Sequence, residues 1–138
     1  MFSHIENHTD LKKLNREDLS VLCKELRQFL IETILENGGH FAANLGVVEL
    51  TVALHYQLDL PNDQLIWDVG HQSYAHKALT GRKNELKNIR KTGGISGFPS
   101  IAESEFDAFG TGHSSTSISA VLGIAQADRL AGNERQHI

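Results

Sequence analysis

The sequence predicts an α/β fold that is rich in helices and contains the start of a parallel sheet. Apolar residues recur at helical spacing between residues 19 and 34, which is typical of an amphipathic helix. The segment 64–69 is apolar on both faces, as expected of a strand covered on both sides of a parallel sheet. A glycine-rich turn at 110–114 then leads into a further helix. We expect one domain that is incomplete at its C-terminal end.

Composition narrows the classes of function. Hydrophobic residues make up 40% and charged residues 22% of the 138 residues, which is typical of a soluble globular protein. A net charge of -4 without a basic run argues against a nucleic-acid partner. No apolar stretch is long enough to span a bilayer, and the N-terminus lacks the features of a signal peptide. The single cysteine, Cys23, allows no internal disulfide and fits the cytoplasm.

The first half of the chain predicts an arm and two helices. Residues 1–14 show no clear period and are interpreted as an N-terminal surface arm, so the domain is expected to cover 15–138. Asn15 is a candidate N-cap for a helix that ends at Asn37, where two glycines follow. A second helix from about Leu45 to Gln57 is apolar on nearly every face, which predicts that it is buried.

The second half predicts shorter elements. The strand at 64–69 is followed by a short helix to Leu79 and by an exposed helix over 82–90 with Leu86 and Ile89 turned inward. A glycine-rich loop covers 92–99, which is long enough to be mobile.

The last third of the chain predicts one strand, one long helix and the approach to another strand. Residues 105–109 are a candidate strand, and a helix runs from the turn at 110–114 to about Ala131. One stripe of that helix carries only small residues, which permits another backbone to approach closely. Residues 134–138 resemble the approach to a further strand.

Three Gly-His pairs, ending in His40, His71 and His113, lie at predicted junctions between elements and loops. Glycine lets the backbone turn sharply or approach a ligand closely, and an imidazole transfers protons near neutral pH. Three such pairs predict one polar site built from several loop ends. For His40 alone, the pattern favours a solvated histidine after a helix C-cap over a functional residue.

The turn before the last helix has two open interpretations. Free N–H groups at a helix N-terminus suit a phosphate, but the Ser and Thr residues there also suit an ordinary capped helix. The dinucleotide fingerprint is absent because its third glycine is missing, and Thr116 replaces the last glycine of a nucleophile elbow.

The segment from Asp68 to His71 also has two interpretations. Ligands of open α/β sheets bind beyond the C-terminal ends of strands. Alternatively, Asp68 caps the next helix and His71 lies at the surface. The histidines and Cys23 match no usual zinc spacing. Glu49, on the apolar helix, requires a partner if it is buried.

The sequence resembles a known family at several collinear runs from about residue 15 to the end. The longest are Gly38-Gly39-His40-Phe41, Leu45-Gly46-Val47-Val48-Glu49-Leu50-Thr51, Trp67-Asp68-Val69-Gly70-His71-Gln72 and Gly112-His113-Ser114-Ser115-Thr116-Ser117-Ile118-Ser119. Shorter runs lie at 79–82, 93–94, 97–99 and 103–107. These runs resemble the 1-deoxy-D-xylulose-5-phosphate synthases, transketolase-like enzymes that use thiamine diphosphate.

The resemblance implies a reaction and a site. Pyruvate loses carbon dioxide and condenses with glyceraldehyde 3-phosphate, giving a precursor of isoprenoids and thiamine, in a homodimeric enzyme. His71, Gly112, His113 and Ser114 match cofactor-binding positions. His40 matches a histidine near the reacting carbon, so His40 and His71 are the candidate catalytic residues. Arg90 and Glu49 lie in or near matching runs without an assigned role.

The resemblance is partial. The family's Gly-Asp-Gly segment and a later Asn, which hold Mg²⁺, do not occur in these 138 residues, and neither does the second domain. The isolated chain is therefore expected to be inactive. Two other interpretations remain: part of another transketolase-like enzyme, including one split into separate subunits, or a non-catalytic remnant or partner-binding domain.

Overall fold

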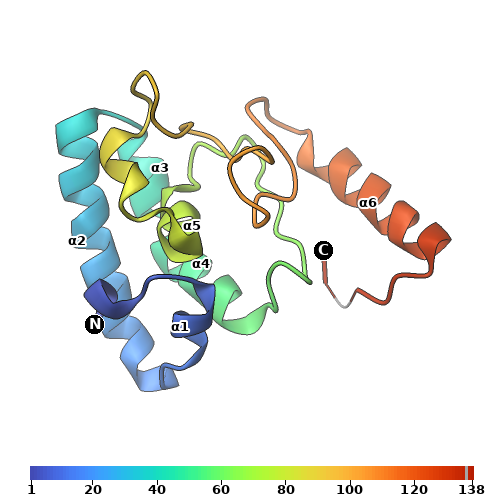
Figure 1. The fold of residues 1–138 in the computed structure, drawn as a ribbon, viewed down its shortest axis with the longest axis horizontal. Helices are drawn as coiled ribbons and strands as arrows, with labels where there is room; N and C mark the ends of the chain where they lie inside the picture. The colour runs from blue at the N-terminus through green and yellow to red at the C-terminus, as the bar shows by residue number, and fades with distance from the viewer. Residues whose placement is uncertain (136) are drawn as a thin grey trace.

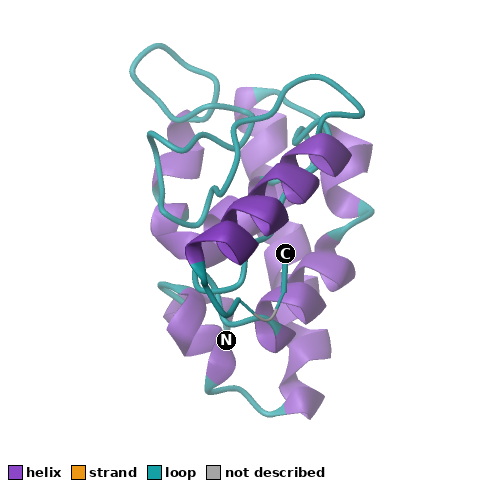
Figure 2. Ribbon diagram, turned by 90° about the vertical axis from the view of Figure 1, so that its right-hand side faces the viewer, coloured by secondary structure: helices purple, strands orange, loops and turns teal. Residues whose placement is uncertain are grey.

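The structure, a computed structural model, describes residues 1–135 and 137–138 and is helical. Figures 1 and 2 show helices joined by long loops, and the described residues contain no strand. The elements are η1 (Phe2–His4), α1 (His8–Lys12), η2 (Arg16–Asp18), α2 (Leu19–Asn37), α3 (Phe41–Leu45), α4 (Val48–Gln57), α5 (Tyr74–Lys77), the π-helical turn η3 (Ala78–Arg82), η4 (Glu85–Asn88) and α6 (Ser117–Ala131). None of the described helices is long and apolar enough to cross a membrane.

Helix α2 forms the centre of the core, as its periodicity predicts. Leu22, Leu26 and Leu30 follow one another at a spacing of four and are completely buried. They belong to the same core as Val48 of α4 and Leu79 of η3. Each buried leucine stabilises the fold by roughly 1.5–3 kcal/mol relative to exposure. The α2 helix ends where Gly38 adopts a φ of 73°, which confirms the predicted glycine terminus.

Residues 1–14 are part of the core rather than a surface arm. Phe2, Ile5 and Leu11 are buried in the same cluster as α2. Together with the buried His8 they recur every three residues, so a short 3-10 turn and a short α-helix turn them all inward. The expectation of an arm was wrong because two elements this short give no extended helical period.

The two predicted strands, 64–69 and 105–109, are not strands in the structure. A strand requires a neighbour, because its backbone N–H and C=O groups are satisfied only by a ladder. Among the described residues, the segment 64–69 makes only the beginning of a ladder, in which Gln64 N donates to His137 O at 3.1 Å. The prediction of a strand approach over 134–138 falls partly outside the described residues.

The predicted second helix is two helices, α3 and α4, separated near Gly46. Helix α4 is buried only on the side that contacts α2 and α5. Leu50 of α4 is 55% exposed, and Glu49 and Ala53 are also exposed. The expectation of a fully buried helix was therefore wrong, since apolar composition does not say which faces have neighbours.

The elements that follow agree more closely with the sequence. Gly81, at a φ of 89°, ends the short helical segment that precedes it. Of the predicted exposed helix over 82–90, Arg82 ends η3 and 85–88 form η4, and Leu86 and Ile89 are fully buried as expected. Residues 92–99 form a loop without helix or strand.

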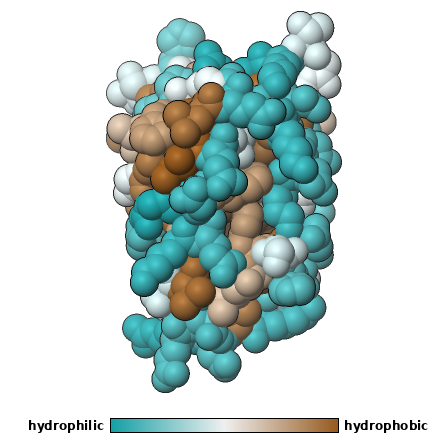
Figure 3. Space-filling view, turned by 90° about the vertical axis from the view of Figure 1, so that its left-hand side faces the viewer, coloured by the Kyte–Doolittle hydropathy of each residue, from teal (hydrophilic) through white to brown (hydrophobic). Residues whose placement is uncertain are grey.

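Helix α6 lies apart from the helical body (Figure 1) and has no buried residue. It covers the predicted span and ends at Gly132 in the left-handed conformation. Its apolar side chains Ile118, Leu122 and Leu130 are 69–79% exposed. On the opposite side of the molecule, the face seen in Figure 3 shows small apolar patches among hydrophilic side chains.

Candidate active site

His40 and His71 lie together, although 31 positions separate them in the sequence. Their ring centroids are 5.0 Å apart with the rings edge to face. His40 stands at the N-cap of α3, just after the end of α2, and His71 lies in the loop before α5. The Nδ1 atom of each ring is buried without a hydrogen-bond partner. Two of the three Gly-His pairs therefore form one polar site.

Asn44 of α3 joins these two loops. Its side-chain amide donates to the carbonyl oxygens of His40 at 2.6 Å and of His71 at 2.8 Å. Its side-chain oxygen accepts from the backbone N–H of Tyr74 at 2.9 Å. Asn44 is completely buried. The sequence analysis missed this residue; its signal is a lone carboxamide within an apolar segment, since asparagine is unfavourable inside helices unless its side chain is bonded.

The glycines of the first two pairs allow close approach around this site. At Gly70, with a φ of 88°, an added Cβ would lie 2.5 Å from Pro99 Cδ and closer still to the hydroxyl oxygen of Thr111. At Gly39, a Cβ would lie 2.8 Å from the Tyr74 hydroxyl. Only glycine fits at these positions. The neighbouring Val69 has a φ of 61°, an uncommon and strained conformation for a β-branched residue.

The electrostatic surroundings keep His40 neutral at pH 7. Burial lowers the pKa of His40, and the neighbouring His71 and Arg90 lower it further, since a like charge on a neighbour disfavours protonation. Phe98 covers the His40 ring at a centroid distance of 5.8 Å. A neutral imidazole with a free ring nitrogen can accept or donate a proton.

Arg90 belongs to the same neighbourhood. It has a φ of 65°, and its backbone N–H donates to Ile95 O at 2.9 Å. A Cβ on Gly97 would lie 3.1 Å from Arg90 Cγ, and one on Gly38 would lie 4.0 Å from a guanidinium nitrogen. Arg90 therefore places a permanent positive charge beside the histidine pair.

The carboxylate of Asp68 binds the turn before α6. Its carboxylate accepts from the backbone N–H of Ser115 at 2.9 and 3.1 Å and from the hydroxyl of Ser117 at 2.7 Å. These bonds from Ser117 and Ser115 lower the pKa of Asp68. Asp68 thus binds the turn that leads into α6, more than 40 positions away, and not the next helix along the chain.

The third Gly-His pair is open to solvent. Gly112, His113 and Ser114 are all exposed, and a Cβ on Gly112 would meet nothing within 4 Å. The hydroxyl of Thr116 donates to the His113 carbonyl at 3.2 Å. Glu49 is exposed too and pairs with Arg27 at 2.6 Å, so the question of a buried carboxylate at that position does not arise.

A second buried polar cluster was not foreseen. His8, His55 and His76 touch through their ring nitrogens, and His76 meets Asp107 at 3.0 Å. Arg82 donates twice to the same carboxylate, each time at 2.7 Å. These residues come from distant parts of the chain, so no local pattern reveals them.

Ion pairs from Lys77 and Arg82 to Glu103 and Asp107 tie the segment 96–107 to the helices. The carboxylate of Asp107 also accepts from Ser100 N at 2.7 Å, and Lys77 donates to Glu103 at 2.5 Å. Glu103 accepts in turn from Ser96 N at 2.7 Å. The cluster therefore holds in place the loop that carries Phe98 and Pro99.

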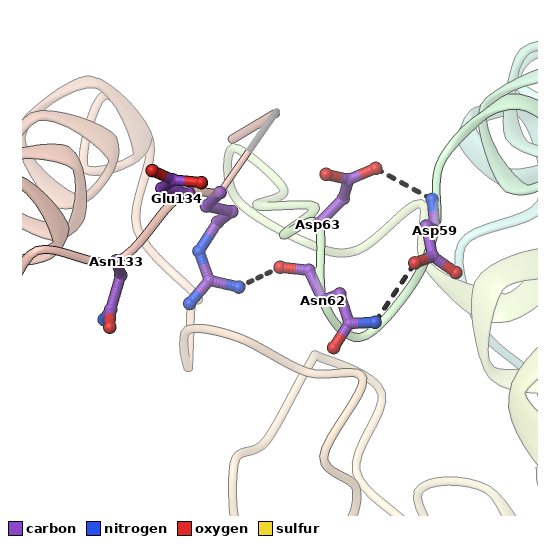
Figure 4. Close-up of a pocket in the computed structure, with 6 residues that line it drawn as sticks. Asp59, Asn62, Asp63, Asn133 and Glu134 are labelled. Atoms are coloured by element: carbon purple, nitrogen blue, oxygen red, sulfur yellow. Dashed lines mark hydrogen bonds between the residues drawn. The ribbon is translucent and has the colours of Figure 1, made fainter.

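A separate surface hollow of about 440 Å³ lies where the chain after α6 returns to the body (Figure 4). Its lining residues are Asp59, Asn62, Asp63, Asn133, Glu134 and Arg135. Arg135 donates to the carbonyl of Asn62, and Asp63 accepts from Asp59 N at 2.8 Å. Over residues 1–135 and 137–138 no group of three or more His, Cys, Asp or Glu side chains is placed to hold a metal ion.

Comparison with known proteins identifies the family of the chain. A family profile described as 1-deoxy-D-xylulose-5-phosphate synthase matches residues 2–138. The chain belongs to the 1-deoxy-D-xylulose-5-phosphate synthase family. It is 58% identical over 134 residues to the synthase of Neisseria meningitidis serogroup C, which covers 97% of this chain and 21% of the relative.

Other members of the synthase family match equally well. The Neisseria gonorrhoeae enzyme is 58% identical over 134 residues, with 97% of this chain and 21% of the relative covered. The Bordetella pertussis enzyme is 56% identical over 138 residues, with 100% of this chain and 22% of the relative covered. The chain thus spans about a fifth of the length of these relatives.

Proposed function

We propose that this chain forms, over residues 2–138, the first part of the cofactor-binding domain of a 1-deoxy-D-xylulose-5-phosphate synthase. The complete enzyme would be a thiamine-diphosphate-dependent transferase that condenses pyruvate, with loss of carbon dioxide, with glyceraldehyde 3-phosphate. The observation that carries the proposal is the pairing of His40 and His71, each with a buried ring nitrogen that has no partner. Buried polar atoms are normally satisfied, so these two nitrogens are suited to a polar ligand.

The residues present suit the reacting centre of the cofactor, and they leave part of the turn at 112–115 free for its diphosphate. Bound thiamine diphosphate supplies the electron sink that decarboxylation of a 2-keto acid requires. His71 would hold it near the reacting centre, and Gly112, His113 and Ser114, all open to solvent, would face its diphosphate. Ser115 N is already bonded to Asp68. The Mg²⁺ ligands would come from elsewhere in the complete enzyme.

His40 is proposed as the group that moves protons at the reacting carbon. Its lowered pKa, caused first by burial, leaves it neutral at pH 7 and able to accept a proton. His71 would donate or accept a hydrogen bond beside it. Arg90, a permanent cation next to this pair, favours anionic substrates, and both proposed substrates are anions.

The setting of the complete enzyme is also a proposal. The cytoplasm fits the composition, and a homodimer would cover the exposed apolar side chains of α6. The segment 64–69 would become the first strand of a parallel sheet once its neighbours are present.

A chimaera tests the proposed function. Residues 2–138 of this chain would replace the equivalent segment of the Neisseria meningitidis relative, and formation of 1-deoxy-D-xylulose 5-phosphate from the two substrates would be measured. We expect turnover that is lost in H40A and in H71A but kept in H4A, which changes an exposed histidine. A ketose donor serves as the alternative substrate.

The outcomes separate the interpretations. Turnover with the ketose donor but not with pyruvate would favour another transketolase-like enzyme. A stable chimaera without turnover on either donor would favour a non-catalytic remnant. The isolated 138-residue chain should show no turnover, and detectable synthase activity in it would refute the expectation that the chain is incomplete.

A further inference from the structure

We propose that Asn44 is a positioning residue that holds His40 and His71 in their edge-to-face arrangement. The two histidines belong to separate loops, one after α2 and one before α5. Asn44 is the side chain that bonds both loops at once. The importance of this arrangement for catalysis rests on the proposed function, but the arrangement itself can be tested without any activity.

The hydrogen bonds of Asn44 use its whole carboxamide. Both amide hydrogens are required, because two different carbonyl oxygens accept from Nδ2 at 2.6 and 2.8 Å. The carboxamide oxygen accepts from the Tyr74 backbone at 2.9 Å. Only asparagine or glutamine offers two donors and an acceptor in one planar group. Because Asn44 is completely buried, its loss would leave the His71 carbonyl and the Tyr74 N–H without a partner.

The bonds of Asn44 reach far along the chain as well as locally. The bond to His40 spans four residues, whereas the bonds to His71 and Tyr74 span 27 and 30. A local cap would have needed only the first. The two long-range bonds therefore fasten the start of α5 to α3.

Among the described residues, no side chain holds the His40 or His71 ring by a hydrogen bond. Within residues 1–135 and 137–138, no hydrogen bond is made to either ring, and both Nδ1 atoms are unpartnered and buried. The ring positions therefore follow from the backbones that carry them and from apolar neighbours such as Phe98. Asn44 fixes these two backbones relative to each other.

Nuclear magnetic resonance of the 138-residue chain tests the proposal. With labelled histidine, the unsubstituted chain should show a cross-relaxation peak between the His40 and His71 rings, whose centroids are 5.0 Å apart. N44A should lose this peak, and the pKa of His40 should rise because its burial is relieved. A peak of unchanged intensity in a folded N44A chain would overturn the proposal.

T51V is the matched control. Thr51 is also fully buried, lies in the neighbouring α4 and donates its hydroxyl to the Val47 carbonyl at 2.7 Å. Its removal costs a buried side-chain to backbone bond without touching either histidine loop. T51V should therefore lower the melting temperature and keep the ring-to-ring peak. Loss of the peak in T51V as well would show that general loosening, and not Asn44, controls the arrangement.

A second measurement covers the case in which N44A does not fold. In the unsubstituted chain, the two side-chain amide hydrogens of Asn44 should exchange with solvent far more slowly than those of the exposed Asn62 and Asn84. Equal exchange would overturn the proposal. Neither measurement involves catalysis, so an inactive chimaera would defeat the proposed function and leave the role of Asn44 intact.

Discussion

The buried histidine cluster predicts that stability falls steeply as the solution becomes mildly acidic. His55 and His76 are completely buried, and His8 is 3% exposed. The ring nitrogens of His8 and His55 are 3.3 Å apart, and those of His55 and His76 are 2.9 Å apart. Three imidazoles so close together cannot all carry a proton in a low-dielectric interior.

The direction of the effect follows from the surroundings of each ring. Burial is the largest cause that lowers the pKa of His8, of His55 and of His76. Arg82 and Lys77 lower the pKa of His76 further, whereas its hydrogen bond to Asp107 raises it without reversing the shift. For His8, Lys12 lowers the pKa and Asp59 raises it.

The sign of the pH dependence follows from these lowered pKa values. Each folded pKa lies below the unfolded value of about 6.5, so the folded chain binds fewer protons than the unfolded chain. The stability that these histidines allow is complete above about pH 6.5 and is lost as the pH falls through their folded values.

The magnitude is set by the number of rings involved. Each histidine that is charged in the unfolded chain and neutral in the folded one lowers the free energy of unfolding by about 1.4 kcal/mol per pH unit. Three such residues give a slope that approaches about 4 kcal/mol per unit below pH 6.5. A domain is typically stable by only about 5–15 kcal/mol, so one unit of acidification removes a large part of the total.

Urea unfolding followed by circular dichroism measures this slope at about pH 7.5, 6.5 and 5.5. H55M removes the central imidazole and should reduce the slope by about 1.4 kcal/mol per pH unit. H4Q changes an exposed histidine and should leave the slope unchanged. A free energy of unfolding that stays constant down to pH 5.5 would refute the reasoning, because it would mean that the three rings are not buried neutral.

Three substitutions test other parts of the fold by urea unfolding at pH 7.5. D107N should destabilise the chain by about 3–5 kcal/mol, because it removes the closer of the two carboxylates that pair with the buried Arg82 and leaves Glu103 at 3.5 Å; a cost below about 1 kcal/mol would contradict the burial of this pair. E49Q, in an exposed ion pair, should cost less than about 1 kcal/mol. G70A should cost at least about 1–3 kcal/mol from backbone strain alone, and the added Cβ should push Pro99 away from residue 70; an unchanged midpoint would show that the loop yields easily.

The helices were largely predictable from the sequence and the strands were not. Helix α2 carries its own period and its own glycine stop, so local information suffices. The segment 64–69 has the composition of a strand, yet the bond from Gln64 to His137 is too little to make one. Pairing is decided by chain segments far away in sequence, which a local pattern does not contain.

The proximity of His40 and His71 was predictable, because each histidine follows a glycine at a loop end. Gly39-His40 and Gly70-His71 were singled out as loop-end pairs, and the structure brings their rings together. Asn44 becomes meaningful only when both loops are in place, because its partners lie up to 30 positions away. The same holds for the histidine cluster, whose members are joined by tertiary packing alone.

The turn before α6 shows why a helix N-terminus is an ambiguous pattern. Its free N–H groups favour a negative charge, but they do not specify whether that charge is a phosphate or a carboxylate of the chain itself. Here Asp68 supplies it, at a separation of 47 residues from Ser115. Thr111 adds a second link by donating to the Val69 carbonyl at 2.9 Å.

These two links join the segment that ends in His71 to the segment that begins α6. Because α6 has no buried residue, its placement depends on such polar contacts more than on packing. In the proposed complex, a diphosphate at Gly112–Ser114 would lie next to the Asp68 carboxylate, which accepts the backbone N–H of Ser115. Binding there would therefore act on the position of α6 and on the loop of His71 together, because Asp68 connects them.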